Sequence, residues 1–347
     1  GFRTAVFEAV PESLKTAIVA GIGFFIAFIG LVDSGIIRRM PDAAGTTVPV
    51  SFGVGGHLLG WPTLVFIFGL FLTIALFIRN VRGAILIGVV ASTALSIILE
   101  AVFHIGSGKG NPTGWSLNVP ALNNFSFSAP DFSLIGSARF GAFGAIGVLG
   151  ASLLVFAILL SVFFDAMGVS VGLATEAGTI DKDGKVENIN EVLLVDAVGS
   201  VVGGGASGSA NQIFVESATG IGEGARTGLA NIVTGVLFLV AIIASPLVTI
   251  VPFEAVAPAL VVVGFLMVRQ AVNVDWNDLA LGISAFLTIV IMPLSYSIAH
   301  GIGAGFISYT VIRVATGRGR EVHWLMYVVS AVFAVHFGMG LIEGWMR

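Results

Sequence analysis

Two carboxylic acids lie inside apolar stretches of this sequence. Asp165 follows Phe164, and Glu216 follows Phe214 and Val215. If these stretches span a bilayer, an acid near the centre costs about 2.5 to 3.5 kcal/mol on insertion scales, so it faces a cavity, a proton path or a partner. A buried acid that keeps its proton can donate and accept hydrogen bonds toward a ligand. The two acids therefore indicate ligand binding and proton transfer. The structural alternatives are a bond between helices for Asp165 and a helix N-terminal cap for Glu216.

The sequence before Glu216 is unsuited to a regular helix that faces lipid. Seven small residues occupy 203–209, and the β-prone stretch 212–215 follows. We expect an extended break near 210–215 and a short helix that begins at Glu216. Irregular backbone at membrane depth occurs where protein or a cavity covers it, and such breaks form the substrate sites of secondary transporters.

Side chains around the break and beside Asp165 complete the candidate binding set. Aromatic rings next to the acids could stack on a planar ligand, although packing is the commoner role for any one of the 27 Phe residues. The amide of Asn211 could form hydrogen bonds with the edge of a ring, or it could only hold the break together. Asp196 is interpreted as a structural residue at the membrane boundary. The candidate substrate-binding residues are Asp165, Glu216, Phe214, Asn211, Gln212, Val215 and Phe164, and the candidates for proton coupling are Glu216 and Asp165.

The composition predicts a membrane protein. Of 347 residues, 56% are hydrophobic and 10% are charged, and the mean hydropathy is +1.02. A soluble domain carries about 25% charged residues, so this chain lacks the charge to cover a surface exposed to water, and we expect a lipid bilayer to solvate it. The 46 glycines predict close contacts between helices. Gly141, Gly144, Gly147 and Gly150 form a stripe that suits such a contact.

The composition also excludes several functions. The absence of Cys excludes disulfides, thiolate metal sites and Cys nucleophiles, and the five His residues do not pair at the spacing of metal ligands. No cofactor is predicted beyond a proton as the coupling ion. The net charge of -4 offers no basic patch for nucleic acid. No nucleophile elbow of the form Gly-x-Ser-x-Gly follows a strand, and an enzyme is the least favoured class.

Charge-free apolar runs place ten expected spans and a last apolar stretch at 323–342 that spans or lies at the interface. The run 279–312 would measure about 50 Å as one helix, against a hydrocarbon core of about 30 Å, so we expect it to break near His300. Residues 103–138 are rich in Gly, Asn, Ser and Pro and predict a long external connection. The expected spans are 13–36, 61–79, 82–102, 149–176, 189–205, a broken element at 210–224, 227–250, 254–271, 277–297 and 300–316.

Six short motifs in this order resemble the AzgA-like purine permeases of the nucleobase/cation symporter-2 family. The motifs are Phe163–Gly168, Phe214–Gly220, Gly224–Gly228, Pro258–Gly264, Asp275–Asp278 and Ser284–Pro293. The resemblance covers residues 1 to 340. It implies an all-α polytopic membrane protein with the uracil-permease-like fold of two inverted seven-helix repeats, in which a core that binds the base moves against a gate. The chain would then begin just before the fifth helix, and the first four helices would be absent.

The same resemblance divides the chain into gate and core helices. Residues 1–102 would be gate helices of the first repeat, 103–138 an external loop, 139–250 core helices of the second repeat, 251–316 its gate helices and 317–347 a C-terminal apolar helix.

Carried over to this sequence, the resemblance makes Asp165 the acid of the eighth helix and Glu216 the acid that begins the helical part of the tenth. Phe214 matches an aromatic position, and Asn211 matches a polar residue just before the break. The chain departs from the family pattern at four positions: Val162 and Ala166 replace an Asp and a Thr, and Gln212 and Ile213 stand where small hydroxyl residues are usual.

The expected function is import of purine nucleobases such as hypoxanthine, guanine or adenine by proton symport, in a multi-pass protein of the plasma membrane. A homodimer is left open. One alternative is an anion transporter of the same fold, of the sulfate or bicarbonate type, which the acid at the break disfavours because an anion prefers a bare helix N-terminus or a cation. Another is a truncated remnant or assembly partner that does not transport.

Overall fold

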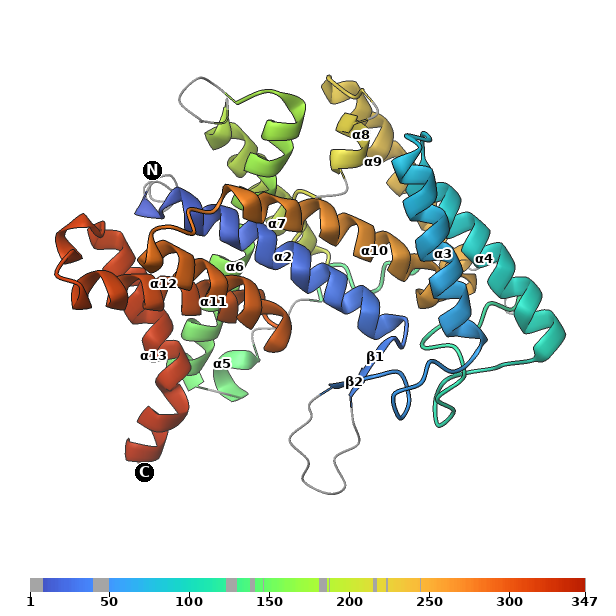
Figure 1. Ribbon diagram of the computed structural model, residues 1–347, viewed down its shortest axis with the longest axis horizontal. Helices are drawn as coiled ribbons and strands as arrows, with labels where there is room; N and C mark the ends of the chain where they lie inside the picture. Colours follow the sequence, from blue (N-terminus) through green and yellow to red (C-terminus); the bar gives the residue numbers. More distant parts are fainter. Residues whose placement is uncertain are drawn as a thin grey trace. The chain divides into compact units, whose positions relative to one another are not determined.

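The computed structural model describes residues 9–39, 50–122, 130–137, 141–145, 147–180, 186, 188–214, 217–222, 224–243 and 245–346 (Figure 1). These residues are mostly helical. The helices are α2 (Glu12–Asp33), α3 (Trp61–Ile78), α4 (Ala84–Phe103), α5 (Ala142–Ala145), α6 (Gly147–Ala177), α7 (Ile189–Gly205), α8 (Ser217–Gly222), α9 (Gly228–Ile243), α10 (Phe253–Val268), α11 (Leu279–Leu294), α12 (Ile298–Ala315) and α13 (Trp324–Met346). Short 3-10 helices follow α9 (η2, Ser245–Ile250), α10 (η3, Arg269–Asn273) and α12 (η4, Gly319–Glu321), and β1 (Ile37–Arg39) pairs antiparallel with β2 (Val50–Phe52).

Five helical segments in the described part of the chain are long and apolar enough to cross a membrane. They are Glu12–Asp33, Trp61–Ile78, Ala84–Phe103, Phe253–Asn273 and Ile298–Ala315. The shorter helices Gly228–Ile243, Leu279–Leu294 and Trp324–Gly338 are also apolar. The predicted class, an all-α polytopic membrane protein, is therefore confirmed.

The chain divides into two compact units. The first unit takes its residues from 1–25, 132–224 and 266–347, and the second from 26–131 and 225–265. In the first unit, the early part of α2 packs against two other helices. A Cβ placed on Gly21 would lie 3.3 Å from Ile289 Cα of α11, and one placed on Gly168 of α6 would lie 3.0 Å from Val19 Cγ2.

The break expected in the run 279–312 occurs at 295–297, three residues before the predicted position. Pro293 lies in the last turn of α11, and Tyr296 adopts a positive φ of 54°. The hydroxyl of Ser297 then accepts a hydrogen bond from His300 N (3.4 Å) and caps α12. Proline and the capping serine, rather than the apolar length of the run, decide where the first helix ends and the second begins.

Two other expectations differ from the structure. The predicted span 227–250 is shorter, because α9 ends at Ile243 and Pro246 lies in η2, where it supplies no N–H for a continuing helix. The predicted glycine contact is not observed at three of the stripe residues. A Cβ on Gly141, Gly144 or Gly147 would meet no atom of the described residues within 4 Å.

In the second unit, α3 and α4 form a hairpin around small residues that face one another. Gly69 of α3 lies against the Ser92 side chain of α4, and Gly88 of α4 lies against the Thr73 side chain of α3. Each helix therefore presents a glycine and a hydroxyl residue four positions apart. The glycine of each helix contacts the hydroxyl residue of the other helix. Small residues let two helix backbones approach closely within a membrane.

Ser92→Ala is expected to raise the free energy of unfolding by about 1 kcal/mol. Ser92 is 0% exposed, and its Oγ has no hydrogen-bond partner in the described part of the chain. Removing an unpaired buried hydroxyl relieves a desolvation cost of about 1 to 3 kcal/mol, less the packing lost. Thermal unfolding of the purified protein in detergent measures the effect.

Ser96→Ala is the matched control for Ser92→Ala. Ser96 lies one turn later on α4, is equally buried, and donates a hydrogen bond to Ser92 O (2.7 Å). Its replacement is expected to cost about 0.6 kcal/mol, typical of such bonds in membranes. Equal losses for the two variants would contradict the assignment of Ser92 as unpaired.

Candidate functional site

Asp165 lies near the middle of α6, on a helix face that is less buried than its surroundings. Ala166 and Met167 beside it are each 1% exposed, whereas Asp165 and Val162 are both half-buried. Residues three apart share one face of a helix. The carboxyl of Asp165 therefore belongs to the same face as Val162, one turn earlier.

The predicted break is present as a segment that doubles back along α7. After α7, residues 206–208 form a turn in which Ser207 has a φ of 60° and Gly208 N donates to Gly203 O (2.9 Å). Residues 209–214 then form neither helix nor strand. A Cβ on Gly203 would lie 2.5 Å from Ser209 O, and one on Gly199 would lie 3.5 Å from Asn211 O. Two glycines one turn apart thus give the returning chain room against α7.

Three hydrogen bonds fix this segment to α7 and α6, the two long helices that precede it in sequence. Ser200 Oγ of α7 donates to Asn211 O (3.1 Å), and Ile213 N donates to Asp196 Oδ1 of α7 (3.2 Å). The third bond reaches α6, where the side chain of Gln212 donates through Nε2 to Val162 O (3.1 Å). Because Val162 precedes Asp165 by one turn, this bond brings the break to the face of α6 that carries Asp165.

Two of the residues that depart from the family pattern thus meet one another, since Gln212 bonds the backbone of Val162. An amide side chain can span the gap to α6, whereas a short hydroxyl side chain reaches less far. This bond gives Gln212 a structural role. Because the bond uses the amide nitrogen, the amide oxygen of Gln212 can still act as an acceptor.

Asp196, interpreted from the sequence as a structural residue, makes a contact that the sequence does not predict. It is only 8% exposed and accepts a hydrogen bond from a backbone N–H of the break. Its position was visible in the sequence as an acid within the apolar helix 192–202, three residues before Gly199. What the sequence did not show is that the chain after α7 turns back past this face.

The other predicted site residues are placed as follows. Phe214 is 59% exposed, and Asn211 is exposed with its backbone oxygen bonded to α7. Val215 and Glu216 lie outside the described residues, as does the side chain of Phe164. The short helix α8 (Ser217–Gly222) packs against α6, and the predicted start of this helix at Glu216 lies outside the described residues. Among the predicted residues that the structure describes, Asp165, Asn211, Gln212 and Phe214 therefore lie on α6 or on the segment attached to it.

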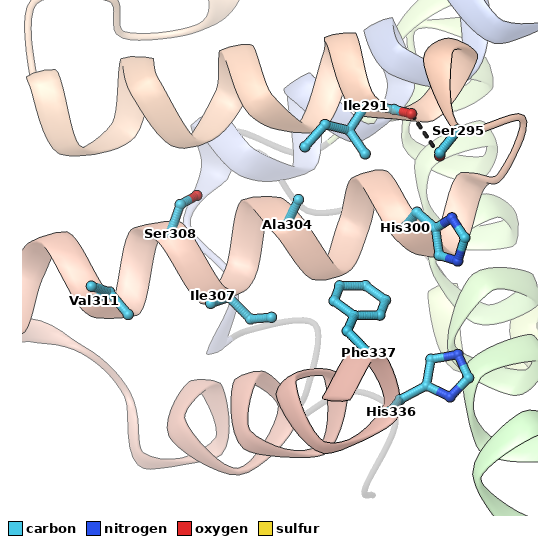
Figure 2. Close-up of a pocket in the computed structure, with 9 residues that line it drawn as sticks. All are labelled: Ile291, Ser295, His300, Ala304, Ile307, Ser308, Val311, His336 and Phe337. Carbon is cyan, nitrogen blue, oxygen red and sulfur yellow. Dashed lines mark hydrogen bonds between the residues drawn. The ribbon is translucent and has the colours of Figure 1, made fainter. Parts of the chain in front are cut away.

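A cleft of about 690 Å³ lies elsewhere in the first unit, among α11, α12 and α13 (Figure 2). Figure 2 shows His300, Phe337 and His336 grouped at one end of it. Most of the other lining residues are apolar, and the hydroxyl of Ser295 is used by its own helix, where it donates to Ile291 O (2.7 Å). This cleft contains no predicted site residue and offers few polar groups to a ligand, so the break beside Asp165 is the better candidate site.

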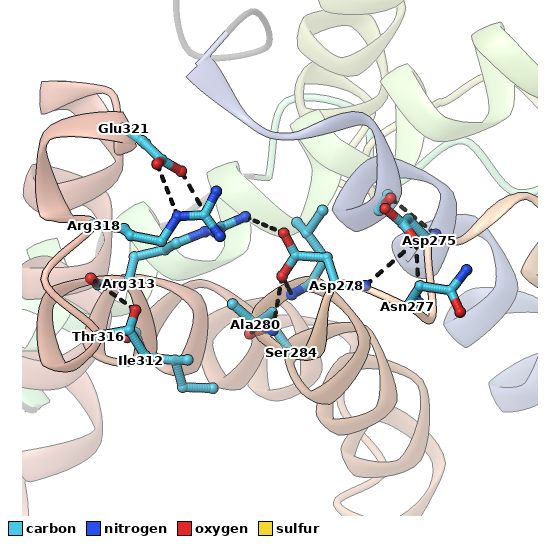
Figure 3. A network of polar contacts seen from close by, with 12 residues as sticks. Asp275, Asn277, Asp278, Ala280, Ser284, Ile312, Arg313, Thr316, Arg318 and Glu321 are labelled. Carbon is cyan, nitrogen blue, oxygen red and sulfur yellow. Dashed lines mark hydrogen bonds and ion pairs between the residues drawn. The ribbon is translucent and has the colours of Figure 1, made fainter.

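A network of charged residues also lies in the first unit, at the opposite end of the α11–α12 hairpin from its turn (Figure 3). Asp278 caps α11 by accepting from Ala280 N (2.9 Å) and pairs with Arg313 Nη2 of α12 (2.6 Å). Glu321 then lies 3.5 Å from Arg313 Nη1 and 2.8 Å from Arg318 Nε. Each charge has an opposite charge beside it, so the network fastens the two helix ends together rather than leaving a group for a ligand.

Comparison with known proteins shows the family of the chain. Residues 1–304 match the model of the family described as "Permease family". A putative permease of Methanocaldococcus jannaschii is 38% identical over 335 residues, which cover 96% of this chain and 71% of the relative. A guanine/hypoxanthine permease of Bacillus subtilis is 36% identical, with 97% of this chain and 71% of the relative covered. An adenine permease of Escherichia coli is 35% identical, with 96% and 69% covered.

The apolar helices, the irregular segment bonded between α6 and α7, and the family match agree with one another. The chain belongs to the Permease family and is a multi-pass membrane transporter, not an enzyme.

Proposed function

We propose that the protein transports purine nucleobases by proton symport, with the base bound between Asp165 on α6 and the break at 209–214 together with Glu216. The observation that carries the proposal is the attachment of an irregular segment to the Asp165 face of α6 in a permease whose relatives include guanine/hypoxanthine and adenine permeases. A purine is planar and carries both donors and acceptors on its edge. Carboxyl, amide and aromatic side chains match those features.

The proposed roles follow from the chemistry of each side chain. Asp165 and Glu216 hold the polar edge of the base, and at least one of them gains and loses the coupling proton. Phe214 covers a ring face, and Asp196 is a positioning residue that holds the backbone of the break through Ile213 N. The helices of 139–250 form the core that moves, and those of 1–102 and 251–316 form the gate.

Uptake by the complete protein in proteoliposomes tests the proposal. We expect labelled hypoxanthine, guanine or adenine to enter against its gradient when a pH gradient is imposed, acid outside. One pH unit is worth about 1.4 kcal/mol, or about tenfold accumulation for one proton per base. An uncoupler that collapses the gradient is expected to remove the accumulation.

The same assay separates the alternatives. Competition by unlabelled purines, but not by sulfate or bicarbonate, is expected. Inhibition by the anions instead of the purines would point to an anion transporter, and purine uptake that ignores the pH gradient would contradict proton symport while leaving purine transport intact.

A further inference from the structure

The second unit contains a buried carboxyl group that the proposed transport site does not use. Glu254 lies in the first turn of α10 and is 1% exposed. Its Oε1 accepts from Ser116 N (2.9 Å) and lies 2.7 Å from Ser116 Oγ. Its Oε2 is buried and has no hydrogen-bond partner among the residues that the structure describes. Ser116 belongs to the connection that follows α4, so this contact joins residues 138 positions apart.

The hydroxyl of Ser116 has more acceptors than it has hydrogens. Ser116 Oγ lies 2.7 Å from Glu254 Oε1 and 2.9 Å from the backbone oxygen of Asp33 at the end of α2. A hydroxyl has one hydrogen, and both a carboxylate and a carbonyl only accept. If Glu254 is ionised, one of the two short contacts therefore has no hydrogen in it. The positions of Ser116 Oγ and Glu254 Oε1 are compatible with donation in either direction, because the positions of hydrogens are inferred from the hydrogen-bond network.

A proton on Glu254 satisfies both contacts. The protonated Oε1 donates to Ser116 Oγ, and Ser116 Oγ donates to Asp33 O. The amide of Ser116 still donates to the remaining lone pair of Oε1. The unpartnered Oε2 is then the oxygen of a neutral carboxylic acid, which costs less to bury without a hydrogen bond than half of an anion does.

The charged groups near Glu254 are Arg38 of β1 and the partial charge at the N-terminus of α10. Arg38 makes no ion pair with Glu254 in the described residues, and its Nε donates to Gly35 O (3.1 Å). Asp33 contributes to the cluster through its backbone oxygen, which accepts from Ser116 Oγ.

Glu100 of α4 provides the contrast, because it bonds the same connection. Its Oε2 accepts from Trp115 Nε1 (2.7 Å) and from Gly106 N (3.2 Å). Both partners are N–H groups that can only donate, so each of these contacts contains a hydrogen without a proton on the carboxyl. Trp115 and Ser116 are adjacent in sequence but bond different acids. Trp115 bonds the carboxyl of Glu100, which only has to accept, whereas Ser116 bonds the carboxyl of Glu254, which must both accept and donate.

We propose that Glu254 is a proton-binding site of the chain, and that its protonated form fastens the connection after α4 to α10 and to the end of α2. When the proton leaves to solvent, the single hydrogen of Ser116 Oγ serves either Glu254 Oε1 or Asp33 O but not both, so one of the two attachments is lost and the segment 104–122 loosens. Asn118, which donates through Nδ2 to Val248 O and Val251 O (3.1 Å each), remains as the second attachment of the same connection. The proposal does not depend on the identity of the transported substrate.

Infrared difference spectroscopy of the full protein in lipid tests the protonation. We expect a C=O stretching band of a protonated carboxylic acid that is present in the wild type, shifts in D2O, and disappears in Glu254→Gln. Glu100→Gln is the matched control and is expected to leave that band in place. Loss of a carboxylate band instead of a carboxylic acid band in Glu254→Gln would overturn the proposal.

A second variant covers the case in which Glu254→Gln fails to fold. Ser116→Ala keeps the acid but removes its acceptor, so the band is expected to move to the higher frequency of a carboxylic acid that donates no hydrogen bond. A band that stays at its wild-type frequency would show that Glu254 does not donate to Ser116.

Hydrogen exchange of 104–122 tests the fastening. After correction for the intrinsic pH dependence of exchange, raising the pH until the Glu254 band is lost is expected to speed exchange in the wild type about tenfold, the worth of one hydrogen bond. Glu254→Gln, whose amide can still donate to Ser116 Oγ, is expected to show no such step. An equal step in both proteins would overturn the role of Glu254.

Discussion

Accumulation of a labelled purine is expected to stop when Asp165 is replaced with asparagine. Asparagine keeps the shape and hydrogen-bonding capacity of the side chain but cannot gain or lose a proton. If Asp165 carries the coupling proton, the variant can still exchange the bound base across the membrane. The proton gradient and the membrane potential, however, no longer drive its accumulation. A membrane potential of 100 mV is worth about 2.3 kcal/mol per charge, which corresponds to about fortyfold accumulation. We expect Asp165→Asn to reduce this ratio to about one, measured in proteoliposomes with the interior negative.

Asp196→Asn is the matched control for Asp165→Asn. Both substitutions neutralise an acid in a neighbouring helix of the same unit, but the observed task of Asp196 is to accept a hydrogen bond from Ile213 N, and the Oδ1 of asparagine can accept it too. We expect this variant to keep its accumulation, with a modest change in apparent affinity.

The two acids of the proposed site can also be separated from one another. Glu216→Gln is expected to weaken binding of the base in either case, and to abolish accumulation only if Glu216 is the proton carrier. Full accumulation in both Asp165→Asn and Glu216→Gln would contradict the assignment of the site.

Gly301→Val is expected to destabilise the protein and to lower the yield of folded protein. Gly301 lies where α12 crosses α11, and a Cβ there would meet the Met292 side chain, lie 2.7 Å from Thr288 O and lie 3.1 Å from Met292 N. Two of these three neighbours are backbone atoms, so a change of rotamer cannot make room. Overpacking costs about 1 to 3 kcal/mol and occasionally more, and we expect about 3 kcal/mol here. The fraction of protein recovered as a monodisperse peak, and its thermal midpoint, measure the loss.

Gly235→Val in α9 is the control for this packing argument. A Cβ on Gly235 would meet nothing within 4 Å, and valine and glycine differ little in their helix propensity. We expect this variant to be recovered like the wild type. Equal recovery of the Gly235 and Gly301 variants would show that the close approach of α11 and α12 does not limit stability.

Helix positions were predictable because an interval without charge is a local property of the sequence. The expected span 61–79 became α3 at Trp61–Ile78, and 189–205 became α7 at Ile189–Gly205. The end of α9 was missed because the length of an apolar run outweighed a single signal, Pro246, that was present in the sequence.

The candidate site was predictable in part, and for the same reason. A run of small residues next to an acid predicts irregular backbone, and the irregular segment at 209–214 confirms this prediction. Which helix faces receive the segment depends on contacts between residues distant in sequence. The bond between Gln212 and Val162, 50 positions apart, and the use of Asp196 could not be read from periodicity.

The glycine contacts show the same limit. The stripe that begins at Gly141 has the spacing of a packing surface but meets no neighbour in the described residues, whereas Gly301 and Gly305 meet Thr288 closely. A small residue permits a close approach, and the partner helix decides whether the approach occurs.

The α11–α12 hairpin has a consequence for biosynthesis. The hydroxyl of Ser284 donates to Ala280 O (2.7 Å), and that of Thr288 donates to Ser284 O (2.8 Å), so each is satisfied within its own helix. The glycines of α12 close over them without supplying a hydrogen bond. At that surface neither helix presents an unpaired hydroxyl of Ser284 or Thr288, so each helix can be stable in lipid before the two meet. We therefore expect the pair to associate there by close packing rather than by a hydrogen bond.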